Sequence, residues 1–89
     1  SNQIFKELPN LNIVALKVRE GSEVIAKSIK EIQFRKIYGV TLVAILRDDR
    51  LIEHPDARFV LQQNDTVYIM GRSEEISNAF DLFGKDETS

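Results

Sequence analysis

Cysteine is absent from this 89-residue sequence, while histidine occurs once and proline twice. The absence of cysteine excludes disulfides, thiolate nucleophiles and cysteine-rich zinc sites, and it is typical of a reducing compartment. The one histidine, His54, stands directly before Pro55 in a segment that predicts a turn, so no catalytic triad can be argued around it. We interpret His54 as a turn or surface residue.

An excess of charge of one sign and a long apolar run are also missing. With 12 basic and 14 acidic residues, the formal net charge is −2, which gives no electrostatic surface for the backbone of nucleic acids or for anionic lipid. No apolar stretch approaches the roughly 20 residues that cross a bilayer, and the N-terminus lacks the layout of a signal peptide. We therefore expect a soluble chain that binds no nucleic acid, and any membrane link would come from sequence outside it.

Glycine-rich phosphate loops are absent, because the glycines stand singly at the ends of predicted elements, at Gly21, Gly39, Gly71 and Gly84. Two carboxylate pairs could serve acid–base chemistry or hold a divalent cation if they converged in a cleft. However, Asp48-Asp49 fits a turn, and Glu74-Glu75 fits the first turn of a helix, where carboxylates stabilise the positive end of the dipole. A small enzyme is thus the alternative with the least support.

Length and composition predict one globular domain. The chain is near the size at which a single core can stabilise a fold, and 43% hydrophobic with 29% charged residues is typical of folded rather than disordered proteins. We expect residues 1–10 to form an N-terminal extension whose first residues, Ser1 and Asn2, resemble those left by a cloning vector. Residues 11–84 should fold, and residues 85–89 should fray.

Two segments carry the clearest strand patterns. Residues 11–19 are rich in β-branched and aliphatic side chains, with Val14, Leu16 and Val18 on one face. Residues 40–46 form a nearly unbroken apolar run, which predicts a central strand covered on both faces.

The strand at residues 40–46 is followed by turn-forming residues at positions 47–50, which predict a hairpin. Turns are also predicted at residues 54–56 and 62–65. Between and after these turns the chain has three further short strand segments, at residues 51–52, 59–61 and 66–70.

Two segments predict helices. Ser28 and Glu31 form a capping box at the start of the first, residues 28–37, which should end near Gly39. The second helix starts at Ser73 as its N-cap. Its apolar residues recur at the spacing of one helix face, at Ile76, Ala79, Phe80 and Phe83.

The order strand, helix, strand, strand, short strand, strand, helix predicts an α+β fold with a small, mainly antiparallel sheet and two helices. A sheet this small with apolar strands leaves an exposed edge or a bare face, and a symmetric partner is the commonest cover. We therefore expect a homodimer.

Short segments between Val18 and Phe83 resemble, in unbroken order, the TrkA C-terminal domain, which is the second half of the RCK (regulator of potassium conductance) module. These segments are Glu20-Gly21-Ser22, Ala26-Lys27-Ser28-Ile29, Arg35, Tyr38-Gly39-Val40, Val43-Ala44-Ile45, Arg47-Asp48, Leu51-Ile52, Pro55, Leu61, Asp65, Val67-Tyr68, Met70-Gly71 and Ser73.

The residues predict no catalytic activity, metal or cofactor, and the resemblance implies a regulatory domain. Members of that family dimerise and work on the cytoplasmic side of potassium channels, potassium uptake systems and cation:proton antiporters, where they convert ligand binding into gating. The implied partner is the membrane-embedded part of a transporter, in the same or another chain. In some members cyclic di-AMP binds in the cleft between the two copies.

Carried over to this sequence, the resemblance implies a cleft lined by Ile29, Phe34 and Pro55 as apolar surface and by Arg35 and Thr41 as polar contacts. Without the resemblance, the sequence singles out Arg35 alone among these five residues. Arg35 lies late in the first predicted helix, where a cation stabilises the negative end of the dipole and could also reach an anion.

Two positions depart from the ligand-binding relatives. Gln33 stands where they tend to carry an acid, and Val40-Thr41 replaces a more polar pair. A second hypothesis therefore stays open, in which the chain is a ligand-free dimerisation and assembly module of a membrane carrier.

Overall fold

Four antiparallel strands form one sheet in the computed structural model, which describes residues 11–84. The order along the sheet is β1-β4-β2-β3, so that β4 and β2 are the inner strands. The predicted extension at residues 1–10 and the predicted frayed tail at 85–89 lie outside the described residues. The strands are β1 (Leu11–Lys17), β2 (Thr41–Arg47), β3 (Arg50–Glu53) and β4 (Thr66–Arg72).

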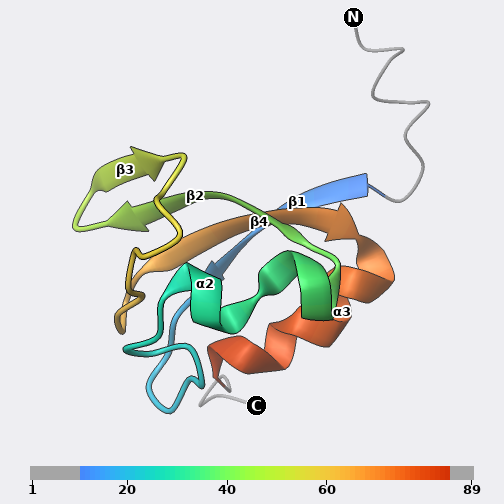
Figure 1. Ribbon diagram of the computed structural model, residues 1–89, viewed down its shortest axis with the longest axis horizontal. Coiled ribbons are helices and arrows are strands. Elements are labelled where there is room, and N and C mark those ends of the chain that lie inside the picture. Colours follow the sequence, from blue (N-terminus) through green and yellow to red (C-terminus); the bar gives the residue numbers. More distant parts are fainter. Residues whose placement is uncertain (1–10, 85–89) are drawn as a thin grey trace, which may run out of the picture.

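The helices all lie on one face of this sheet (Figure 1). The predicted α+β class and order of elements are confirmed, except that the short strand expected at residues 59–61 is a single bridge between Ser28 and Val60. We call the opposite face, which none of the described helices covers, the outer face. The helical elements are α2 (Ile29–Ile32), the π-helix η1 (Phe34–Tyr38), α3 (Ser73–Phe80) and the 3-10 turn η2 (Asp81–Phe83).

A β-bulge in β2 explains its unbroken apolar run. Leu42 pairs with Ile69 and Ala44 pairs with Tyr68, so that Val43 is an extra residue on β2. Such an insertion re-aims the side chains that follow it. Leu42 and Ile45 face the helices, whereas Val43 and Ala44 both line a cavity on the outer face. Val43 is 38% exposed, so the prediction that β2 is covered on both faces is wrong for a single copy.

The core lies between the sheet and the helices. Leu16 and Val18 are buried and Val14 packs against the same cluster, which confirms the predicted inward face of the first strand. The rings of Phe34 and Phe83 stack across the core with their centroids 6.3 Å apart. Side chains with at most 1% exposure come from both layers, and the apolar ones are Val18, Val24, Val40, Ile45, Leu61, Val67, Ile69 and Ala79.

The first predicted helix is interrupted. The capping box is present, because Ser28 Oγ accepts the Glu31 N–H at 3.1 Å and the Glu31 carboxylate accepts the Ser28 N–H. Gln33, with φ of 58°, then takes the left-handed conformation and ends α2 after four residues. In a continuous α-helix Ile32 and Phe34 would point about 200° apart. The break lets both enter the core, at 7% and 3% exposure.

The second predicted helix begins one residue earlier than expected. Its N-cap is Arg72 rather than Ser73, and the Arg72 N–H donates to the Glu75 carboxylate at 3.1 Å. Ile76, Ala79 and Phe83 are buried as their spacing predicts. Phe80 is 54% exposed, because it lies beside the edge strand β1, where no described element covers it.

Replacing Gly39 by alanine should destabilise the fold more than the same change at Gly21. Both glycines have positive φ, 73° and 82°, so each alanine carries a cost of about 1 kcal/mol. At Gly39 the new Cβ would also meet the Glu75 carboxylate, whereas at Gly21 it would meet nothing within 4 Å. Displacing Glu75 weakens its capping bond and adds about 1 kcal/mol. Urea unfolding measures both losses, and equal losses would contradict this account.

Candidate functional site

The five residues of the expected ligand site come from four places in the fold. Ile29 starts α2, Phe34 and Arg35 begin η1, Thr41 starts β2 and Pro55 follows β3. Arg35 and Thr41 are exposed, while Ile29 and Pro55 are half-buried. These four side chains therefore remain available at the surface.

Phe34 is buried in the core of a single copy. Its side chain is only 3% exposed, and its ring stacks on Phe83 inside the core. In this conformation it cannot offer an apolar surface to a ligand. It instead anchors the start of η1, the segment that carries Arg35 at the surface.

The side chain of Arg35 has no hydrogen bond or ion pair with the residues that the structure describes. It lies two positions after the left-handed Gln33, in a π-helix, a distortion that is frequent at functional sites. The irregular backbone thus holds an unpaired guanidinium at the surface, and a guanidinium is well suited to bind phosphate or carboxylate.

Backbone hydrogen bonds hold the segment after Pro55 against the start of α2. The N–H of Ile29 donates to the Phe59 carbonyl at 3.0 Å, and the N–H of Lys30 donates to the Ala57 carbonyl at 2.8 Å. The N–H of Leu61 donates to the Lys27 carbonyl at 2.9 Å. Residues 57–61 and 27–30 are therefore bonded into one unit, which fixes the surroundings of Ile29 and Pro55.

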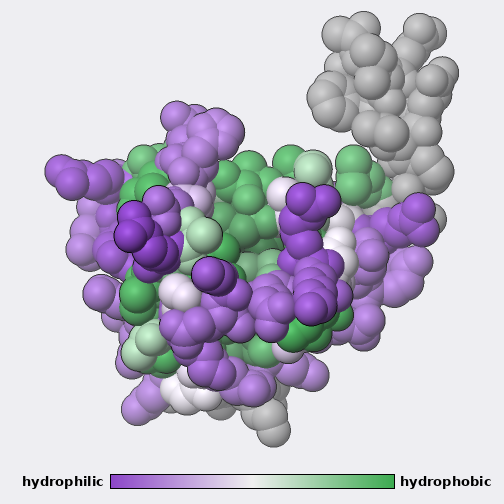
Figure 2. Space-filling view, in the orientation of Figure 1, coloured by the Kyte–Doolittle hydropathy of each residue, from purple (hydrophilic) through white to green (hydrophobic). Residues whose placement is uncertain are grey.

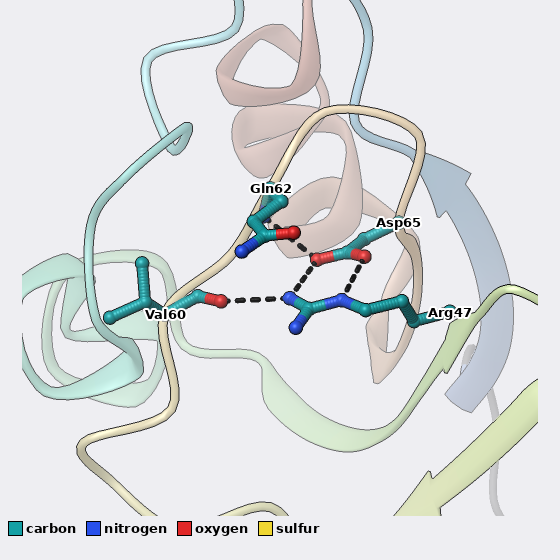
Figure 3. A network of polar contacts seen from close by, with 4 residues as sticks. All are labelled: Arg47, Val60, Gln62 and Asp65. Atoms are coloured by element: carbon teal, nitrogen blue, oxygen red, sulfur yellow. Dashed lines mark hydrogen bonds and ion pairs between the residues drawn. The ribbon is translucent and has the colours of Figure 1, made fainter.

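An ion pair with one fully buried partner, Asp65, fixes this unit to the sheet (Figure 3). Arg47 Nε donates to Asp65 Oδ1 at 2.7 Å, and its Nη2 donates to Oδ2 and to the Val60 carbonyl, both at 2.8 Å. The N–H of Gln62 also donates to Oδ2 at 2.8 Å. Asp65 is 1% exposed, and its hydrogen bond raises the pKa of Arg47 above its usual value. The guanidinium also lies 4.6 Å from the centre of the Phe59 ring.

Local patterns do not predict this pair, because Arg47 and Asp65 lie 18 positions apart and each falls in a segment predicted as a turn. The available signal was the resemblance, since Arg47-Asp48 and Asp65 both belong to the segments that carry it. An acid directly before an apolar strand was a second, weaker sign.

The other polar groups singled out in the sequence have local roles. Asp48 and Asp49 both have positive φ and form the two-residue turn between β2 and β3, as hairpins of this length require. Glu75 caps α3. His54 is exposed beside the cavity on the outer face.

No group of three or more possible metal ligands gathers within residues 11–84. None of the helices in that range has the length and apolar character of a membrane span.

The cavities described for one copy do not include the expected ligand residues. The one on the outer face has a volume of about 410 Å³ and is lined mainly by apolar side chains: Ile13, Val43, Ala44, Leu51 and Tyr68, with Glu53 and His54. Arg35 and Thr41 are instead exposed at the surface of a single copy.

A family model described as the TrkA-C domain matches residues 13–84. Among curated proteins, the ammonium/H(+) antiporter subunit AmhM of Alkalihalophilus pseudofirmus is 27% identical over 67 residues, which cover 75% of this chain and 40% of that protein. The K(+)/H(+) antiporter subunit KhtT of Bacillus subtilis is 28% identical over 68 residues, 75% and 41% of the two chains. The chain thus spans less than half the length of these relatives.

Among solved structures, the RCK_C domain dimer of S. agalactiae BusR in complex with c-di-AMP has a TM-score of 0.74 and 28% identity. The likeness covers 80% of this chain and 93% of that one. The RCK C domain of the potassium transport protein KtrA, also in complex with c-di-AMP, has the same TM-score. At 23% identity over 86% of this chain and 88% of that one, it supports the fold alone.

Replacing Arg47 by lysine should lower the free energy of unfolding by about 2 kcal/mol, because lysine cannot form the two-pronged contact with Asp65 and keep the bond to Val60. Arg58→Lys is the matched control. Its ion pair with Asp56 is 3.5 Å long between side chains 89% and 67% exposed, so the change should stay within about 0.5 kcal/mol. Urea unfolding compares the two, and similar losses would contradict the prediction.

Proposed function

Because the chain belongs to the TrkA-C domain family, a regulatory and not a catalytic family, we propose that it regulates a monovalent cation transport system as a pair of copies with a cyclic dinucleotide between them. The observation that carries this proposal is the likeness to the BusR RCK_C domain dimer with c-di-AMP, which covers 93% of that chain. The relatives among antiporter subunits support a transport system as the setting.

The chemistry of the exposed residues suits cyclic di-AMP. The ligand has two adenine rings, which need apolar surface, and two phosphates, which need cations. Ile29 and Pro55 offer half-buried apolar surface, Arg35 offers an unpaired guanidinium and Thr41 a hydroxyl. A ligand built of two equal halves also suits a site on a two-fold axis, to which each copy contributes the same residues.

The two departures from ligand-binding relatives carry different weight. Val40 is fully buried, so the loss of a polar residue there changes the core and not the ligand surface. Gln33 is exposed two positions before Arg35, and as a neutral residue it brings no negative charge near the bound phosphates.

We further propose that the domain works on the cytoplasmic side of the membrane, with the membrane-embedded part of a transporter in the same or another chain as its partner. A ligand-free assembly module of such a carrier is the second candidate. The apolar outer face favours it, since that face can join two copies without any ligand.

Cyclic di-AMP should raise the melting temperature of this chain. A ligand present at 100 times its dissociation constant adds about 2.7 kcal/mol to the free energy of unfolding. Arg35→Ala should abolish most of the shift, because it removes the cation for the phosphates. Arg19→Ala is the control, because Arg19 is an exposed arginine two residues beyond the end of β1, and its backbone N–H donates to the Phe83 carbonyl.

If cyclic di-AMP does not shift the melting temperature of the wild-type chain even at high concentration, it is not the ligand, and the ligand-free assembly module is the candidate that stands. Equal shifts of the melting temperature in the wild type and in Arg35→Ala would show that cyclic di-AMP binds, but not at the site assigned to Arg35.

A further inference from the structure

We infer that the open edge of β1 binds an extended peptide segment of a partner protein, which adds to the four-stranded sheet as a further strand and covers Phe80. The segment alternates apolar with polar side chains and carries an acid opposite Lys17. This inference goes beyond the proposed function, because none of the five expected ligand residues lines the cavities beside β1.

The two edge strands of the sheet differ in how they are protected. β3 has four residues, with a charged residue at each end, Arg50 and Glu53. β1 has seven residues in unbroken register with β4, contains no proline and carries one charge, Lys17. Natural sheets protect an exposed edge by shortness, charge, proline or a bulge. The long, regular and mostly apolar edge of β1 therefore indicates a site for strand addition.

Half of the backbone groups of β1 face away from β4. Just beyond β1, the N–H of Val18 donates to the Asp65 carbonyl at 2.7 Å, so the backbone of Val18 points toward the β4 side. This direction alternates along an antiparallel strand. The N–H and C=O groups of Ile13, Ala15 and Lys17 therefore point to the open side, where no strand of the described residues pairs with them.

The open edge ends where η2 closes it. The N–H of Arg19 points the same way as that of Lys17 and donates to the Phe83 carbonyl at 2.9 Å. An added strand therefore pairs with Leu11 to Lys17, which is a length of about 23 Å.

The helical layer extends beyond the sheet at this edge. α3 contacts both β4 and β1 (Figure 1). Ile76 and Ala79, on the apolar face of α3, are buried at 8% and 0% exposure. Phe80 has the spacing of the same face, four residues after Ile76, and yet is 54% exposed. A strand added to β1 would lie about 4.8 Å farther out and cover the ring.

Two cavities between the β1 edge and the C-terminal helical segment meet at Phe80. The larger has a volume of about 620 Å³ and is lined by Val14 and Ile76 among others, while the smaller, of about 150 Å³, is lined by Phe83 among others. Phe80 lines both, so the inward-facing side chains of an added strand would fill a cavity on each side of its ring. Figure 2 shows that hydrophobic surface continues along the strands to the start of β1.

Charge and composition indicate which occupant fits. Within residues 11–84, neither Lys17 nor Arg19 has an ion pair, and no acid lines the smaller cavity. An acid opposite Lys17 on the added strand would form a cross-strand ion pair. A second copy of β1 offers none, because residues 11–19 contain no acid, and residues 85–89 contain no apolar side chain to cover Phe80. The occupant that fits is therefore a segment of another protein.

Binding of the labelled peptide Glu-Val-Thr-Phe-Thr-Val-Thr, followed by fluorescence anisotropy, tests the edge. In antiparallel pairing its glutamate lies opposite Lys17 and its phenylalanine opposite Val14, beside Phe80. Phe80→Ala should raise the dissociation constant about tenfold, because the ring is the largest apolar contact. Ile37→Ala is the matched control, since Ile37 is a similarly exposed apolar residue, at 58%, on η1. Circular dichroism checks that both variants fold.

N-methylation of single peptide nitrogens separates strand pairing from apolar contact. Methylating the third residue, which lies opposite Ala15, removes a donor that faces β1 and should weaken binding about fivefold or more. Methylating the fourth residue, whose N–H points away from β1, is the matched control and should leave binding within about twofold. Equal effects of the two methyl groups would overturn strand addition.

An exchange of charges tests the register. Lys17→Glu should weaken binding of this peptide about threefold, and lysine in place of the peptide's glutamate should restore the affinity for the variant. A loss that this exchange does not restore would overturn the assigned register.

A wild-type chain that binds the peptide no better than one of the same composition without the alternation would overturn the inference, as would binding unchanged by Phe80→Ala. Binding that appears only after deletion of residues 1–10 would assign the edge to the chain's own segment instead. A peptide that dissociates a dimer in sedimentation would assign the edge to a second copy. The melting shift with cyclic di-AMP tests the proposed function separately from all of these results.

Discussion

The ion pair between Arg47 and Asp65 is the contact on which the arrangement of the candidate site depends. A carboxylate with 1% exposure is costly unless every acceptor is used, and Asp65 takes bonds from Arg47 and from the Gln62 backbone. Because Arg47 also holds the Val60 carbonyl, the pair ties β2 to the long connection before β4. That connection in turn bonds to the start of α2, so the positions of Ile29 and Pro55 follow from a contact that neither of them makes.

Ligand and partner would meet at the short stretch between η1 and β2. Arg35 lies on one side of Gly39 and Thr41 on the other, and the first belongs to the helical layer while the second opens onto the outer face. If both copies contribute to one cleft, ligand binding strengthens pairing and pairing strengthens ligand binding by the same factor. Such coupling suits a regulatory domain, because a change in ligand concentration becomes a change in how tightly two subunits are held together.

Features that depend on neighbouring residues were predictable from the sequence. The capping box of Ser28 and Glu31 and the turn at Asp48-Asp49 follow from local hydrogen bonding and backbone preference, and both are present. Features set by packing were not. The break at Gln33 exists because two residues two positions apart must both reach the core, and Phe34, expected at the ligand surface, is buried for that reason.

The inserted residue in β2 has a consequence for how this domain can change over time. It shifts the alternation of side chains along the strand. Leu42 and Ile45 are therefore constrained by packing in the core, whereas Val43 faces only the outer surface. Substitutions at the outward position can therefore accumulate without disturbing the fold. One strand thus keeps a fixed interior and a variable exterior, and proteins with the same core can come to recognise themselves, or each other, through different surfaces.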